Sequence, residues 1–274
     1  MRKIGLVIAT LVLSVSFAVG QTAPSDDKAK LTAANEALSK AFAAGNQAFG
    51  AKDYDAAILH YDTALKIYEQ PPILSNKATA LSARAVARFN AAVKMPDGAA
   101  KTTALDTARY DWKLAAEASG KAVSIARPAN GIGHTSLLIF LKTHADVMRF
   151  VATKVDVARA QEAVAAFNEY FGLEKDSAAL DKARLDQANL LLQVGEHSGA
   201  VLYFDTVLTK APANIDANFG MASATFLMQD PTYFQRSANA AKKFLDLAPP
   251  TDPRRKDAQE ILDYLKSEAN IVPK

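Results

Sequence analysis

One pattern of residues occurs twice in this sequence and limits what the chain can fold into. In residues 45–65 a polar turn precedes Ala57, and apolar or aromatic residues follow at the fourth, seventh and eighth positions after that alanine. Residues with this spacing share one face of an α-helix. The same offsets recur after Ala200, within residues 195–208. A helix pair with one apolar face cannot bury it alone, so the pattern predicts an all-helical stack of several pairs.

Weaker copies of the pattern lie between these two segments and after the second one. One copy is centred on Ala115. Another ends at Pro249, because proline has no amide hydrogen and so ends a helix. The helix expected after Pro253 has one apolar face and one charged face, as the end of a stack requires. Two registers fit the unit whose second helix is expected over residues 158–173: Ala163/Phe167/Tyr170 and Ala160/Val164/Phe167.

Together these units resemble the tetratricopeptide repeat (TPR) family, whose repeats are helix pairs of about 34 residues. The resemblance covers residues 31–264 and implies an all-α fold, a right-handed α-α superhelix (TPR solenoid) of about five helix pairs plus a C-terminal capping helix. In this family the concave face usually binds another protein. The resemblance therefore implies a non-catalytic scaffold or adaptor that binds a protein or peptide partner and needs no cofactor. Two alternatives are a component of a cell-envelope assembly or secretion complex, and a periplasmic small-ligand-binding solenoid that serves a transporter.

The same resemblance places the binding surface on the first helix of each pair. By the family template, that surface carries Phe42, Asn46, Phe49, Asn76, Thr79, Leu185, Asp186, Asn189, Phe219, Ser223 and Phe226. Asn46 and Asn76 match, in type and spacing, the two asparagines with which co-chaperone TPR modules clamp a terminal carboxylate. Phe42 stands where that clamp has a lysine, so the carboxylate ligand is not implied. Two interpretations stay open for the asparagines: their amides bind a peptide backbone, or they are polar residues that face water.

The second unit is longer than the template. Ala57 and Ala115 occupy equivalent positions but lie much further apart than one repeat of about 34 residues. The extra residues lie around 88–111 and contain the turn sequence Met-Pro-Asp-Gly, residues 95–98. Helical periodicity on both sides of this turn predicts a helical hairpin that projects from the stack. Such an insertion either contributes to binding or is a length variation without a role.

The N-terminal segment has the pattern of an export signal. Arg2 and Lys3 precede an apolar run, residues 4–19, and Ala18-Val19-Gly20 offers small residues at the two positions that a signal peptidase reads. This pattern predicts a signal peptide over residues 1–20, cleaved after Gly20, and a periplasmic or secreted protein with no stable membrane insertion; an uncleaved anchor is the alternative. The remaining chain is expected to form a flexible lead-in over 21–27, a TPR solenoid over 28–268 and a C-terminal tail over 269–274.

The residues that could carry catalytic or metal chemistry form no recognisable motif. His60, His134, His144 and His197 do not form a His-x-x-x-His pair, and the chain has no cysteine to supply a thiolate. These patterns predict neither an enzyme nor a metal site. The formal net charge of +3 falls close to neutrality once the signal peptide is removed, which argues against nucleic acid as a partner. The glycines within residues 128–134 lack the lysine and the strand of a nucleotide loop, so they indicate a break between units.

Overall fold

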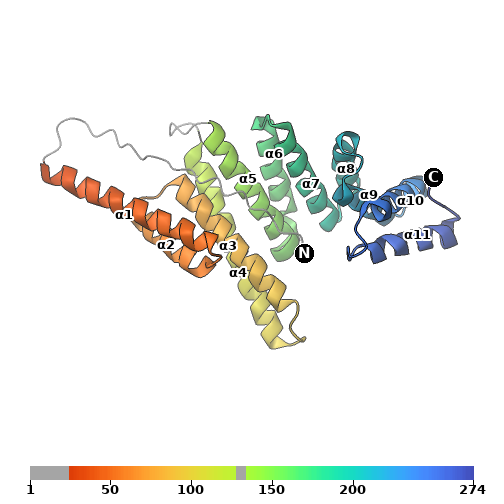
Figure 1. Ribbon diagram of the computed structural model, residues 1–274, viewed down its shortest axis with the longest axis horizontal. Coiled ribbons are helices and arrows are strands. Elements are labelled where there is room, and N and C mark those ends of the chain that lie inside the picture. The colour runs from red at the N-terminus through yellow and green to blue at the C-terminus, as the bar shows by residue number, and fades with distance from the viewer. Residues whose placement is uncertain (1–24, 128–133) are drawn as a thin grey trace. The chain divides into compact units, whose positions relative to one another are not determined.

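The computed structural model describes residues 25–127 and 134–274, and within these residues every regular element is a helix. Eleven α-helices follow one another along this part of the chain (Figure 1). The predicted signal peptide, its cleavage position and residues 128–133 of the predicted break lie outside the described residues. The predicted lead-in over 21–27 is described only from Ser25, where the first helix begins. No helix in the described part is both long and apolar enough to cross a membrane.

The chain divides into two compact units, and unit 1, which ends at Ile132, contains two helix pairs. The pairs are α1 (Ser25–Gly50) with α2 (Tyr54–Ile67), and α3 (Pro71–Ala92) with α4 (Ala99–Ala126). The side chain of Asp53 accepts a hydrogen bond from the backbone N–H of Ala56 at 3.0 Å and so caps α2. Pro71 occupies the first turn of α3, where a missing N–H breaks no helical hydrogen bond.

Unit 2, which starts at Gly133, contains three helix pairs and a final helix. The pairs are α5 (His134–Phe150) with α6 (Ala160–Leu173), α7 (Ser177–Gln193) with α8 (His197–Lys210), and α9 (Ile215–Leu227) with α10 (Pro231–Leu247). A π-helix (Val151–Val155) and a short 3-10 helix (Val157–Arg159) join α5 to α6. The final helix, α11 (Arg255–Ala269), packs on α9 and α10.

These pairs confirm the predicted all-helical class, with five antiparallel helix pairs and a C-terminal helix in the described residues. The structure also decides the register of the third pair. Ala163, Phe167 and Tyr170 are buried, whereas Ala160 and Val164 are only half-buried. A single right-handed superhelix over residues 28–268 stays a prediction, because each unit is described by itself.

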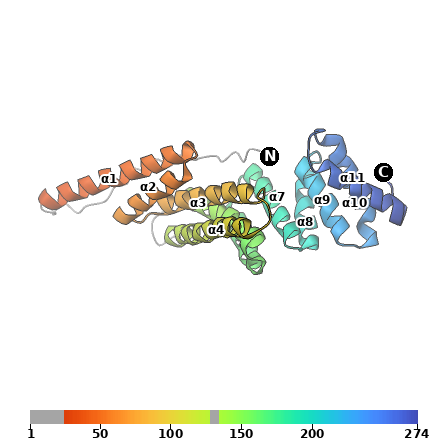
Figure 2. The ribbon, with the colours of Figure 1, turned by 90° about the horizontal axis from the view of Figure 1, so that it is seen from below.

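The helices of the second pair have 22 residues in α3 and 28 in α4, against 26 in α1 and 14 in α2. They meet at a turn in which residues 96–98 are exposed. Gly98 has a φ of +149° there, a conformation that favours glycine. Figures 1 and 2 show this end of the α3–α4 pair beyond the end of the α1–α2 pair. A role for the hairpin around residues 88–111 stays a prediction.

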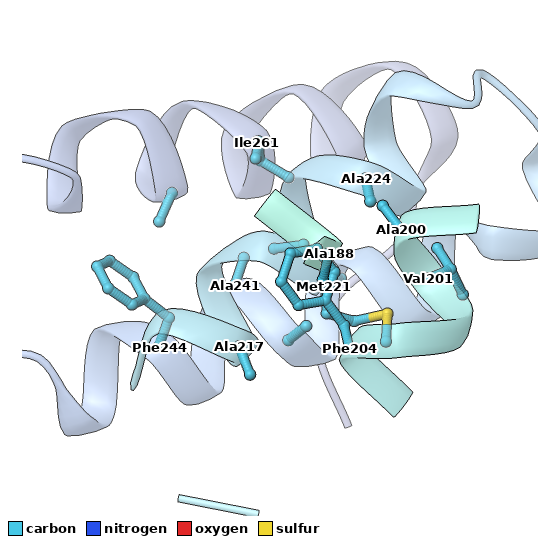
Figure 3. Packing of buried hydrophobic residues seen from close by; sticks show 14 of the residues in the cluster. Ala188, Ala200, Val201, Phe204, Ala217, Met221, Ala224, Ala241, Phe244 and Ile261 are labelled. Atoms are coloured by element: carbon cyan, nitrogen blue, oxygen red, sulfur yellow. The ribbon is translucent and has the colours of Figure 1, made fainter. Parts of the chain in front are cut away.

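Large rings pack directly on glycine in both units. The core of unit 2 contains Phe204 from α8 and Phe244 from α10, both fully buried among alanines (Figure 3). Gly220 of α9 lets Phe204 approach so closely that a Cβ on this glycine would lie 2.1 Å from a ring carbon. In unit 1, a Cβ on Gly45 would lie 2.5 Å from the ring of Tyr61. The absence of a side chain at Gly45 therefore allows α1 and α2 to approach closely.

Candidate functional site

The first helices of successive pairs contact one another within each unit. α1 contacts α3 in unit 1, and in unit 2 α5 contacts α7, α7 contacts α9, and α9 contacts α11. We call these helices the first-helix layer. Every residue predicted to bind a partner lies on this layer, either on α1 and α3 of unit 1 or on α7 and α9 of unit 2. The predicted binding residues therefore form two surfaces, one in each unit.

Asn46, on α1, joins three helices of unit 1 through one side-chain oxygen. Its Oδ1 accepts a hydrogen bond from the Tyr61 hydroxyl of α2 at 2.8 Å, and another from Nδ2 of Asn76, on α3, at 2.9 Å. Burial raises the pKa of Tyr61 to about 12, and the neighbouring Asn76 amide offsets part of that rise. Within the described residues, Nδ2 of Asn46 and Oδ1 of Asn76 have no protein partner. Both asparagines are half-buried, so this amide donor and this amide acceptor can bond to a ligand.

Two aromatic rings flank this amide pair on α1. Phe42 lies four residues before Asn46 and Phe49 three residues after it, so all three share one face of the helix. The rings of Phe42 and Tyr61 are 6.0 Å apart, and those of Phe49 and Tyr54 are 5.7 Å apart, measured between centroids. Both phenylalanines are half-buried. The tyrosines of α2 therefore pack against the two phenylalanine rings, and part of each phenylalanine stays exposed.

The predicted surface of unit 1 is completed by Thr79 and carries no charged side chain. The Thr79 hydroxyl donates a hydrogen bond to the carbonyl of Ser75 at 3.0 Å, one turn earlier on α3. Lys77 lies between them in sequence, but its Nζ is 2.5 Å from Oδ1 of Asp62. The nearest lysine in sequence to the amide pair is therefore neutralised by its own ion pair.

In unit 2, Asp186 of α7 belongs to a charged cluster that was not predicted from the sequence. Lys142, on α5, places its Nζ 2.5 Å from Oδ1 of Asp146 and 3.5 Å from Oδ2 of Asp186. The same Nζ is 5.9 Å from the ring centroid of Phe167. Burial raises the pKa of Asp146, Lys142 opposes the rise, and Asp186 adds to it. Because 38% of the Asp146 side chain remains exposed, solvent moderates the effect of burial.

The sequence contained one signal for this cluster. Lys142 and Asp146 are four residues apart, the spacing of an ion pair on one helix face. The template match is weak in this third unit, so no residue of α5 was predicted for the binding surface. The other two residues predicted on α7, Leu185 and Asn189, are half-buried.

The residues predicted on α9 contact the final helix and the loop before it. The guanidinium of Arg254 lies 5.3 Å from the ring centroid of Phe219, and the ring of Tyr264 meets that of Phe226 edge-on, with centroids 5.2 Å apart. The hydroxyl of Ser223 donates to the Phe219 carbonyl at 3.0 Å. A capping helix packs where the first helix of another pair would lie. It therefore covers part of the surface that the template assigned to α9.

Binding, through hydrogen bonds and aromatic contacts, is the chemistry that these two surfaces support. Among the described residues, no group of three or more His, Cys, Asp or Glu side chains is placed to hold a metal ion. The surface in unit 1 combines amides with aromatic rings, and the surface in unit 2 combines one lysine with two aspartates.

No family model and no curated protein matches the chain. Among solved structures, the chain is similar to the pHSP90 complex of the TPR2AB domain of yeast Sti1, with 16% sequence identity and a TM-score of 0.32. The similarity covers 83% of this chain and 97% of that chain. A TM-score at this level carries no argument about fold or function, so both rest on the helix pairs and contacts described above.

Proposed function

We propose that this protein is an exported, non-catalytic scaffold that binds a protein or peptide segment on its first-helix layer. The observation that carries this proposal is the contact between Asn46 and Asn76, which leaves an amide donor and an amide acceptor beside each other. A peptide backbone offers the complementary pair, one C=O and one N–H per residue. Phe42 and Phe49 add aromatic surface on either side of the amides, and aromatic side chains are enriched at protein interfaces.

Display of random-sequence peptides against the purified chain tests this function. We expect the parent protein to enrich a family of peptides, and we expect Asn76→Ala to weaken the best of them by about tenfold, because one hydrogen bond to the backbone is lost. Asn76→Ala keeps the bond between the Tyr61 hydroxyl and Asn46, so the buried tyrosine retains its partner. Isothermal titration of the synthesised peptide gives the dissociation constants.

Asn90→Ala is the matched control, because Asn90 is an exposed asparagine on the same helix, α3. It should bind the peptide as the parent does. A parent protein that enriches no peptide would refute the proposed function. An Asn76→Ala variant that binds as tightly as the parent would show that the peptide binds elsewhere than at the amide pair.

We also propose export, because Arg2 and Lys3 precede an apolar run over residues 4–19 that leads into the cleavage motif Ala18-Val19-Gly20. Protein purified from its native host should begin at Gln21, or at pyroglutamate formed from it, when its intact mass is measured. A membrane-bound chain that still carries Met1 would instead support the uncleaved anchor.

A further inference from the structure

Phe42 and Phe49 present two apolar contacts at a defined distance along α1. They are seven residues apart, which corresponds to about 10.5 Å along an α-helix axis. Tyr54 and Tyr61, which support these rings, are also seven residues apart on α2. Because each phenylalanine rests on its own tyrosine, the spacing between the two aromatic contacts is set by two helices rather than by one flexible side chain.

The amide pair lies between these two contacts. Asn46 falls between Phe42 and Phe49 on α1, and its bond to Asn76 fixes the position of both amides. A segment that touches both rings and bonds to the amides therefore has a free backbone C=O and N–H between the side chains that make those contacts.

The charge of this surface restricts the segment further. The five predicted residues on α1 and α3 carry no charge, and the neighbouring Lys77 is already paired with Asp62 at 2.5 Å. A charged side chain of a partner would lose water here without gaining a counter-ion, which is unfavourable. The complementary segment is therefore uncharged where it crosses the surface.

Backbone geometry distinguishes the conformations that such a segment could adopt along α1. An α-helix satisfies its own C=O and N–H groups, so the amide pair would find no partner on it. A β-strand repeats its side chains on one face about every 6.7 Å, so its contacts lie near 6.7 or 13 Å and do not match the rise of about 10.5 Å between positions 42 and 49 of α1. A polyproline II segment has three residues per turn and rises about 3.1 Å per residue, so side chains at i and i+3 share one face about 9.3 Å apart. It also makes no internal hydrogen bonds, which leaves its backbone free to meet the asparagines.

We propose that the surface of unit 1 selects an uncharged segment in the polyproline II conformation, with apolar side chains at positions i and i+3. The apolar side chains contact Phe42 and Phe49, and the backbone between them bonds to Asn46 and Asn76. This inference rests on the proposed function and specifies the class of peptide that the same site takes.

Proline-rich host peptides with two leucines test the spacing. The leucines are placed at i and i+2, at i and i+3, or at i and i+4, and a fourth peptide carries a single leucine. We expect the i and i+3 peptide to bind the full chain about tenfold more tightly than the other three, because only it buries both leucines against the rings. Isothermal titration with the unlabelled peptides measures each dissociation constant.

The variant Phe49→Ala removes one of the two contacts. It should bind the i and i+3 peptide no more tightly than the single-leucine peptide. Tyr110→Ala is the matched control, because Tyr110 is an aromatic residue of the same unit that is 60% exposed on α4. This control should keep the tenfold preference, and circular dichroism should show that both variants are as helical as the parent.

The outcomes separate this inference from the function on which it rests. Equal binding of the i and i+2 or i and i+4 peptide, or no binding of any host peptide by a chain that enriches displayed peptides, refutes the polyproline II inference and leaves peptide binding intact. Failure of both the host peptides and the displayed library refutes both.

Discussion

Replacement of Asp111 by alanine should lower the free energy of unfolding of unit 1 by about 3–5 kcal/mol, the usual cost of removing one partner from a buried ion pair. The Asp111 side chain is only 2% exposed, and its carboxylate accepts hydrogen bonds from Arg84 Nη2 at 2.6 Å, Arg84 Nε at 3.0 Å and Arg88 Nη1 at 2.9 Å. Burial lowers the pKa of Arg84, but hydrogen bonds to Asp111 and Asp55 outweigh it and raise that pKa. Without Asp111, the guanidinium of Arg84, 18% exposed, keeps only its bond to the exposed Asp55.

Urea denaturation followed by tryptophan fluorescence measures this loss. Trp112 is the only tryptophan of the chain and lies buried in unit 1, so its emission reports the unfolding of that unit. Asp106→Ala is the control, because Asp106 pairs with Arg109 on the surface of the same helix, with side chains 61% and 40% exposed. Exposed pairs contribute about 0–1 kcal/mol. If Asp111→Ala shifts the urea midpoint no more than Asp106→Ala does, the two arginines do not depend on this carboxylate.

The second large effect is expected at Gly220, where an alanine should destabilise unit 2 by about 3 kcal/mol, near the upper end of the usual cost of overpacking a core. Three ring carbons of Phe204 would lie between 2.1 and 2.8 Å from the new Cβ. Neither group can move easily, because Gly220 lies within α9 and Phe204 is fully buried. The higher helix propensity of alanine, worth about 1 kcal/mol, offsets only part of the clash.

A smaller side chain at position 204 should reduce this loss of stability. The double variant Gly220→Ala with Phe204→Leu should recover stability relative to the sum of the two single variants, because the leucine vacates the space that the Cβ needs. Gly172→Ala is the control: nothing lies within 4 Å of a Cβ at Gly172, so this variant should be as stable as the parent or slightly more stable. Thermal unfolding followed by circular dichroism compares these four variants with the parent. A Gly220→Ala variant with an unchanged midpoint would show that α8 and α9 can separate at no cost.

Local pattern was sufficient to predict the helix pairs. The offsets after Ala57 and Ala200 place both alanines on a buried face, and both are completely buried in the structure. A polar turn was predicted before Ala57, and Asp53 lies in this turn and caps α2. Each of these features depends on residues within two helical turns of one another, and such short-range periodicity is what a sequence displays directly.

The pairing between helices was decided only by the tertiary structure. The sequence was compatible with two registers for the third pair, because both give equally apolar helix faces. In the structure Ala163 and Tyr170 are buried together, which identifies the register. The bond between Asn46 and Asn76 joins residues 30 positions apart, and that between Arg84 and Asp111 spans 27 positions. Sequence periodicity shows which face of a helix is apolar, but it does not show which side chain of another helix lies opposite. That depends on loop lengths and on how closely the helices approach, so the polar contacts that shape the candidate site became visible only in three dimensions.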